Sequence, residues 1–137
     1  MVIDSSALLA ILLQEPDHPA YAAAIESAPV RLISAVTALE AALVIESRKR
    51  DAGGRELDLL IQKAKLTVVP FDAEQSDAAR IAWRKYGKGR HAAGLNFCDC
   101  CAYAVSVTTG EPLLFKGRDF TQTDVEQAPL PLSGRSS

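Results

Sequence analysis

The sequence lacks the features that mark membrane-spanning and disulfide-bonded proteins. No apolar run approaches the roughly 20 residues that cross a bilayer, and the amino terminus has no basic region ahead of its short apolar stretch. The three cysteines, Cys98, Cys100 and Cys101, lie so close together that they cannot form a disulfide framework spanning a fold. We therefore expect a cytoplasmic protein with reduced thiols and no membrane association.

The composition also lacks an excess of positive charge. The formal net charge is −2, whereas proteins that bind nucleic acid usually carry a basic surplus. Any contact with RNA must therefore depend on a local patch. The sequence contains no glycine-rich phosphate-binding loop and no local Ser-His-Asp signature, which argues against a nucleotide-binding P-loop protein and against a serine hydrolase.

A folded single domain is what the length and composition do support. The chain has 137 residues, of which 48% are hydrophobic, enough to form one core. We expect one domain over residues 1–137, with a flexible tail at about 131–137.

Short apolar stretches that predict strands alternate with stretches of helical periodicity. Strands are expected at the first four residues, 30–34, 66–69 and 112–115, with a further candidate at 125–130. Helices are expected at 7–13, 20–27, 37–49, 55–64, 72–86 and 97–109, with Gly53 and Gly54 separating the third from the fourth. Alternation of this kind predicts an α/β fold: a three-layer α/β/α sandwich around a mostly parallel sheet of four or five strands.

Four acidic residues are candidates for a metal-binding site, namely Asp4, Glu40, Asp99 and Asp119. Asp4 ends the first predicted strand and Asp119 follows the strand at 112–115, so both should emerge at the carboxyl edge of the sheet, where such folds bind ligands. Glu40 is expected in the first turn of its helix, and Asp99 near the start of an almost uniformly apolar helix. Carboxylate oxygens are the ligands that Mg²⁺ prefers, and Mg²⁺ supports phosphodiester hydrolysis.

Each of these acids also has a purely structural explanation. Asp4 could cap the helix that follows it, and Glu40 stands at the capping-box spacing from a threonine. Asp99 could favour the positive end of its helix dipole, and Asp119 could be an ordinary turn residue. The combination favours a metal, because clustered carboxylates repel one another unless a cation lies among them.

A basic segment precedes the helix that carries Asp99. It places Arg84, Lys85, Lys88 and Arg90 beside Trp83 and Tyr86. Cations that contact phosphates and aromatic rings that stack on bases are the usual means of holding unpaired RNA. The alternative is a solvated helix end whose cations complement the helix dipole.

The cysteine cluster gives little support for a zinc site. The pattern C-x-C-C lacks the paired spacing of structural zinc sites, and the two histidines, His18 and His91, lie far apart in sequence. Small buried packing residues are the favoured interpretation, and a general-base role for His91 has no further support.

Four segments of the chain together resemble the PIN-domain family, and specifically the VapC toxins of bacterial toxin–antitoxin pairs. The segments are VIDSSALLAIL, SAVTALEAALVI, YGKGRHAAGLNFCDCCAYAVS and PLLFKGRDFTQTDV, and the resemblance extends from Met1 to about Leu130. It implies a PIN-like fold and a magnesium-dependent endoribonuclease, with Mn²⁺ as a possible substitute, that cleaves structured RNA such as tRNA or rRNA. The family's acids would fall on Asp4, Glu40 and Asp99, and the fourth on Asp119.

The resemblance also implies partners: a homodimer, and a heterotetramer or larger complex with a small VapB-type antitoxin. The apolar stripe of residues 8–13 and 20–25 is either core or a groove for an antitoxin helix. Two residues depart from the family pattern, Cys98 beside the third acid and Arg118 beside the fourth. They define the alternative function, a PIN-like RNA- or protein-binding regulatory module with impaired catalysis.

Overall fold

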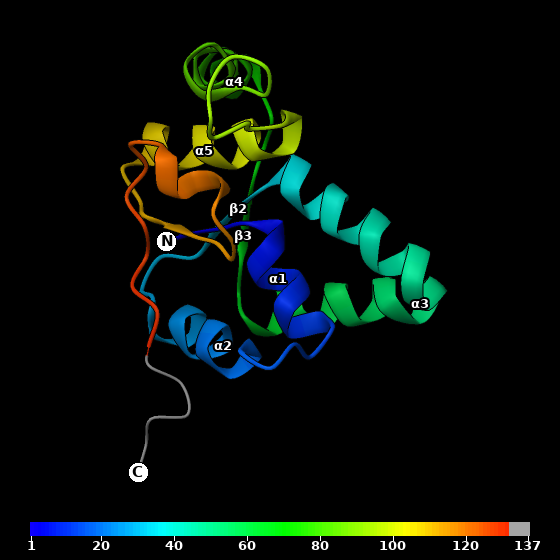
Figure 1. Ribbon diagram of the computed structural model, residues 1–137. Coiled ribbons are helices and arrows are strands. Elements are labelled where there is room, and N and C mark those ends of the chain that lie inside the picture. Colours follow the sequence, from blue (N-terminus) through cyan, green and yellow to red (C-terminus); the bar gives the residue numbers. More distant parts are fainter. Residues whose placement is uncertain (132–137) are drawn as a thin grey trace.

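A parallel four-stranded sheet organises the chain. The structure is a computed structural model that describes residues 1–131, so the expected tail lies, apart from its first residue, outside the described residues. The strands are β1 (Val2–Ile3), β2 (Leu32–Ser34), β3 (Thr67–Val69) and β4 (Leu113–Leu114). They are arranged in the order β3-β2-β1-β4, and every pairing is parallel. The predicted three-layer α/β sandwich is confirmed (Figure 1).

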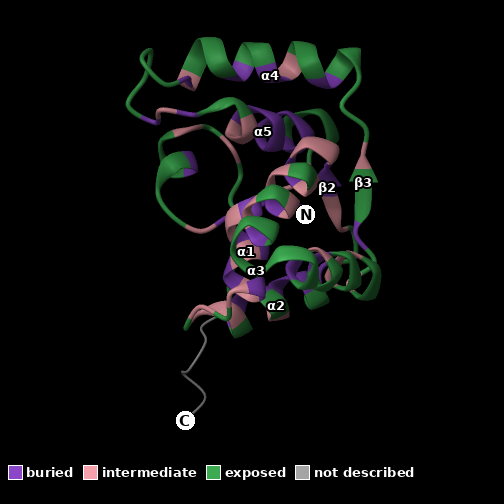
Figure 2. Ribbon diagram, turned by 90° about the vertical axis from the view of Figure 1, so that its right-hand side faces the viewer, coloured by how far each residue is buried: buried purple, intermediate pink, exposed green. Residues whose placement is uncertain are grey.

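Helices cover both faces of this sheet, because successive strand residues point to opposite faces. The helices are α1 (Ser5–Leu12), α2 (His18–Ser27), α3 (Ala35–Lys63), α4 (Ala73–Tyr86) and α5 (Phe97–Thr109), and a 3₁₀ helix, η1, spans Asp119–Gln122. Ile3 and Leu114 belong to the core beneath α1, α2 and α3, whereas Val2 and Leu113 belong to the core beneath α5. Figure 2 shows the buried residues concentrated between these layers.

The two glycines expected to separate two helices do not do so. A single element, α3, covers both predicted helices, and its one break is a kink at Arg50, where φ is 55°. Figure 1 shows the two arms of α3 folded back against each other. Gly53 lies where they meet, because a Cβ atom there would stand 2.7 Å from the carbonyl oxygen of Ile45. The glycine therefore permits close packing of the arms. The prediction of two helices is confirmed, but the break between them lies at Arg50 and not at Gly53 and Gly54.

The predicted fifth strand, residues 125–130, is also wrong. Gln127 forms only an isolated parallel bridge with Leu113, and the amide of Ala128 donates to the carbonyl of Leu113 at 2.8 Å. Pro129 and Pro131 follow directly and have no amide proton to donate to a sheet ladder. Pairing therefore ends after one bridge.

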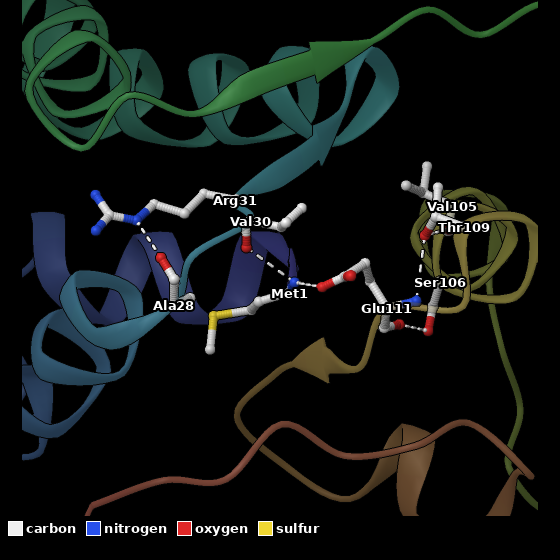
Figure 3. A network of polar contacts seen from close by, with 8 residues as sticks. All are labelled: Met1, Ala28, Val30, Arg31, Val105, Ser106, Thr109 and Glu111. Atoms are coloured by element: carbon white, nitrogen blue, oxygen red, sulfur yellow. Dashed lines mark hydrogen bonds and ion pairs between the residues drawn. The ribbon is translucent and has the colours of Figure 1, made fainter.

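A polar network fixes the amino edge of the sheet (Figure 3). The Met1 ammonium, whose residue is 7% exposed, donates to the carbonyl of Val30 at 2.9 Å and forms an ion pair with Glu111. The Arg31 guanidinium donates to three backbone carbonyls at 2.7–2.9 Å. Within residues 1–131, no helix is long and apolar enough to cross a bilayer.

Candidate metal centre

Asp4 lies at the carboxyl end of β1 and caps α1. Its Oδ2 accepts hydrogen bonds from the Ser6 amide at 3.1 Å and the Ser6 hydroxyl at 2.6 Å. The residue is only 5% exposed, and this burial, with a smaller contribution from the charge of Glu40, raises the pKa of the Asp4 carboxyl. Capping occupies Oδ2 only, so the structural and the metal-binding roles of Asp4 are compatible.

Ser6 is a residue of this site that the sequence reasoning did not single out. Its hydroxyl donates to Asp4 and also accepts a hydrogen bond from the amide of Lys116, just beyond β4, at 2.9 Å. One hydroxyl thus joins the carboxyl ends of two adjacent strands and orients the first acid. A serine two residues after an aspartate is a common helix start, so the sequence signal pointed to capping alone.

Glu40 lies in the second turn of α3, not in the first turn as expected. The helix begins at Ala35, and its N-cap is Ser34, whose hydroxyl accepts from the Val36 amide at 3.2 Å. A capping-box role for Glu40 is therefore excluded, because Glu40 lies too far into the helix. The residue is half-buried, and its charge contributes to the raised pKa of Asp4 and of Asp99. Glu40 is thus left without the structural explanation that competed with a metal-binding role.

Asp99 occupies the first turn of α5 and completes a capping box with Asn96. The Asp99 amide donates to Asn96 Oδ1 at 2.8 Å, and Asp99 Oδ2 accepts from the Asn96 amide at 3.1 Å. Burial raises the pKa of Asp99 to about 6, aided by the charges of Asp4, Asp119 and Glu40 and opposed by the hydrogen bond from Asn96. The three other candidate acids therefore lie within electrostatic reach of Asp99.

Asp119 is the outermost of the four acids. It is the first residue of η1 and is exposed, as is its neighbour Arg118. None of the ion pairs found in residues 1–131 involves Arg118 or any of the four candidate acids. The structure thus brings all four acids to one edge of the sheet, with Asp119 at its open rim.

The donor set of this edge suits a hard divalent cation. It consists of carboxylates only, and two of them have a raised pKa because they are buried close to other negative charges. Within the described part of the chain, no group of three or more His, Cys, Asp or Glu side chains is already arranged to hold a metal ion. Binding of a metal ion would therefore require these carboxylates to rotate toward a shared centre. The positive charge of the ion would offset the repulsion between them.

Within residues 1–131, the three cysteines belong to no group of three or more potential metal ligands. All three are free, and burial raises the pKa of Cys98 and Cys100 to about 11 and that of Cys101 to about 12. His91 has a local role instead, because its Nδ1 accepts a hydrogen bond from the Ala93 amide at 3.0 Å.

The basic segment forms the end of α4 and the loop that leads to α5. Its four predicted RNA-binding residues, Arg84, Lys85, Lys88 and Arg90, are all exposed. A parallel bridge between Gly87 and Leu95 closes the loop, so the segment is held beside the first turn of α5, which carries Asp99.

Comparison with known proteins agrees with this architecture. The PIN-domain family model matches residues 1–126. Ribonuclease VapC30 of Mycobacterium tuberculosis is 53% identical over 131 residues, which cover 96% of this chain and all of that protein.

Two solved structures share the fold at low sequence identity. The crystal structure of Mycobacterium tuberculosis VapC20, a toxin that cleaves the sarcin–ricin loop, has a TM-score of 0.76 at 16% identity, covering 95% of this chain and 98% of that one. A toxin–antitoxin complex from Klebsiella pneumoniae has a TM-score of 0.68 at 13% identity, covering 90% and 92%.

Proposed function

The chain belongs to the PIN-domain family and, within it, to the VapC ribonucleases, and on that premise we propose that it is a Mg²⁺-dependent endoribonuclease. It acts in the cytoplasm as the toxin of a type II toxin–antitoxin pair and cleaves structured RNA such as tRNA or rRNA. The observation that supports this proposal best is the gathering of Asp4, Glu40, Asp99 and Asp119 at one edge of the sheet.

Asp4 and Asp99 are the inner ligands of the proposed metal, and Glu40 and Asp119 complete the set. When bound, Mg²⁺ activates a water molecule for attack on the scissile phosphate and neutralises the charge that develops there. Mn²⁺, which also accepts carboxylate ligands, is expected to substitute. Ser6 holds Asp4 in position, and the capping box with Asn96 holds Asp99, so each inner ligand keeps one oxygen directed by a local hydrogen bond.

The exposed cations of the basic segment contact the RNA backbone. Arg84, Lys85, Lys88 and Arg90 lie beside the helix that carries Asp99. Their charges attract phosphates that the acidic edge alone would repel, so the metal and the basic segment together compensate for the net negative charge of the chain.

A VapB-type antitoxin is the proposed partner, in a complex of toxin dimers. We infer that the apolar stripe, expected to be core or groove, serves as both. Leu8, Leu12 and Ile25 belong to the core, and Ile25 together with the half-buried Ile11 also lines a pocket of about 250 Å³ beside the second arm of α3. A pocket between helices suits the apolar face of a partner helix, and the complex from Klebsiella pneumoniae supports such a partner for this fold.

The decisive experiment is an RNA cleavage assay on the purified chain with Mg²⁺ or with EDTA. Asp4→Asn should lower the cleavage rate by about 10²–10³-fold, the scale of losing one group that stabilises charge in a transition state. Asparagine is as good an N-cap as aspartate, so the fold should remain. The matched control is Asp58→Asn, an exposed aspartate on the second arm of α3, which should cleave at the wild-type rate.

Metal-independent cleavage, or equal rates for Asp4→Asn and the wild type, would reject the metal site. Absence of cleavage in the wild-type chain together with intact RNA binding would favour the alternative, a regulatory module whose catalysis Cys98 and Arg118 impair.

A further inference from the structure

A second pocket lies between α4 and α5, outside the acidic edge. Its volume is about 350 Å³, within the usual range for small-ligand sites. One face of α4 forms one wall, the start of α5 forms the other, and the segment before α4 closes one end. The lining residues that matter here are Phe71, Ala79, Arg80, Trp83, Phe97 and Cys100.

Three aromatic side chains are exposed in this pocket. Phe97 is 65% exposed, Trp83 42% and Phe71 38%. The Phe71 and Phe97 rings meet edge to face, with centroids 6.4 Å apart and an interplanar angle of 72°. An edge-to-face pair leaves ring surface open to a planar ligand. A cluster of exposed aromatic rings on a soluble protein usually marks a binding site.

The Trp83 ring is held in a fixed position. A Cβ atom at Gly87 would lie 2.4 Å from Trp83 Cδ1, so only glycine allows the indole to pack against this turn. On the ring itself, the Arg90 guanidinium lies 4.2 Å from the centroid, in cation–π geometry. A stacking surface that is already ordered loses little conformational entropy when a ligand binds.

The charge around the pocket is strongly positive for this chain. Residues 78–98 contain five Lys and Arg side chains and no Asp or Glu, whereas the whole chain has a formal net charge of −2. Arg80 lines the pocket itself, and Arg90 covers Trp83. The acids that flank this segment in sequence are Asp77, in the first half of α4, and Asp99, in the first turn of α5. Aromatic faces with flanking cations are the combination that binds single-stranded nucleic acid.

The pocket and the proposed catalytic edge share the amino end of α5. Phe97 and Cys100 line the pocket, and Asp99 lies between them in the first turn of α5. Residues two apart on a helix point to opposite sides, so Phe97 and Asp99 present two sides of the same helix end. An RNA strand that passes around the amino end of α5 can therefore contact both Asp99 and the pocket.

We propose that this pocket binds one unpaired nucleobase of the RNA substrate, close to the scissile phosphate, by stacking on Phe97 and Trp83 while Arg80 contacts the adjoining phosphate. This inference rests on the proposed ribonuclease function and extends it, because it assigns the chain a preference for an unpaired nucleotide at the cleavage site. The five cations without an acid over residues 78–98 favour RNA over a protein partner, because a polyanionic backbone is what such a run of charge attracts.

Trp83 provides the test, because it is the only tryptophan of the chain. Short unpaired RNA is added to the Asp4→Asn variant with Mg²⁺, a gel confirms that the strand remains whole, and the tryptophan fluorescence is recorded. Stacking of a nucleobase on Trp83 should quench this fluorescence. An otherwise identical strand with abasic sites keeps every phosphate, and it should bind at least about fivefold more weakly, the lower end of the range for losing one stacked base.

Phe97→Leu keeps an apolar side chain but removes the aromatic face, and it should weaken binding of the intact strand by about fivefold or more while leaving binding of the abasic strand unchanged. The matched control is Ile81→Ala, a 50% exposed apolar residue on α4 outside the pocket, which should bind both strands as the parent does. Thermal melts confirm that both variants fold.

Equal affinity for intact and abasic strands, or the absence of any RNA binding, would overturn the proposal. A pocket that instead holds a second copy of the chain would show Phe97→Leu shifting the oligomer mass toward the monomer, with RNA affinity unchanged, and this outcome would also overturn it. These results are independent of the proposed metal site, which fails only if the wild-type chain cleaves without metal or Asp4→Asn cleaves normally.

Discussion

The two edges of the parallel sheet differ in whether their charged groups have partners of opposite charge. At the amino edge, the Met1 ammonium is paired with Glu111 (Figure 3), and the Arg31 guanidinium donates to three backbone carbonyls. At the carboxyl edge, the acids Asp4 and Asp99 each have a raised pKa because burial and neighbouring carboxylates disfavour their charge. The amino edge stabilises the fold, whereas the carboxyl edge costs stability in the absence of a cation. The difference indicates which edge is structural and which is functional.

The largest effect on stability is expected at the amino edge. Glu111→Ala leaves the buried Met1 ammonium without its carboxylate, and breaking a largely buried pair is destabilising. Since Glu111 is about one-third exposed, we expect a loss of ~2 kcal/mol in the free energy of unfolding, less than the roughly 3–5 kcal/mol lost when a fully buried pair is broken. Urea denaturation of the chain without an amino-terminal tag measures it.

The control for this prediction is Glu126→Ala. Glu126 is exposed, and the contact it makes at this edge is through its backbone carbonyl, which accepts from the Leu113 amide at 2.8 Å. Its substitution should change stability by less than ~0.5 kcal/mol. Equal losses for the two variants would show that the amino edge does not depend on the ion pair.

At the carboxyl edge we expect a substitution to increase the free energy of unfolding: Asp99→Asn should stabilise the fold. The folded-state pKa of Asp99 is raised from 3.8 to about 6. Between these pH values the folded chain therefore binds more protons than the unfolded chain does. The free energy of unfolding consequently falls as the pH rises from about 4 to about 6. In EDTA above pH 6, removal of the charge should stabilise the fold by ~1 kcal/mol after allowance for partial solvent exposure.

At pH 4 the two proteins should unfold alike, because Asp99 is then largely protonated in the folded state. Millimolar Mg²⁺ should raise the melting temperature of the wild type and leave that of Asp99→Asn unchanged. A wild type insensitive to Mg²⁺, or an Asp99→Asn variant less stable at pH 7.5 in EDTA, would contradict the view that charges crowd at this edge.

The smallest effect is expected at Lys116, the cation that lies beside the carboxyl edge. Its Nζ lies 2.6 Å from Glu15 Oε1 and 2.9 Å from Asp17 Oδ1, so it forms ion pairs with these two acids. All three side chains are 36–39% exposed, and pairs of this kind contribute little. Lys116→Met should cost no more than ~0.5 kcal/mol in thermal or urea unfolding. A much larger loss would mean that Lys116 also offsets the charge of the candidate metal-binding acids.

Local signals in the sequence predicted local structure well. The capping residue Asn96, the acid Asp99 and the stop at Gly110 together define the bounds of α5, because every interaction involved lies within a few residues. Asp72 likewise caps α4 by accepting from the Gln75 amide at 3.1 Å. The same locality explains the error at Glu40, since a threonine three residues earlier suggested a cap that the true helix start at Ser34 makes impossible.

Contacts between distant segments were beyond the reach of sequence patterns. Gly53 was expected to break a helix, but it permits the two arms of α3 to approach each other. The kink lies at Arg50, a residue that no sequence pattern indicated. The aromatic pocket combines Phe71, Trp83 and Phe97 from three separate segments, and only Trp83 drew attention in the sequence. Ser6 joins two strand ends through a hydrogen bond to Lys116, 110 residues away.

The sequence by itself determined the α/β alternation, most helix ends and the identity of the four acids, because periodicity, capping and side-chain chemistry are properties of short stretches of chain. Only the tertiary structure decided that these acids share one edge, that the charges of the other three help to raise the pKa of Asp99, and that three aromatic rings form a pocket at the same end of α5. Electrostatic and packing energies depend on distances in space, and parallel strand pairing is what brings residues far apart in the chain within those distances.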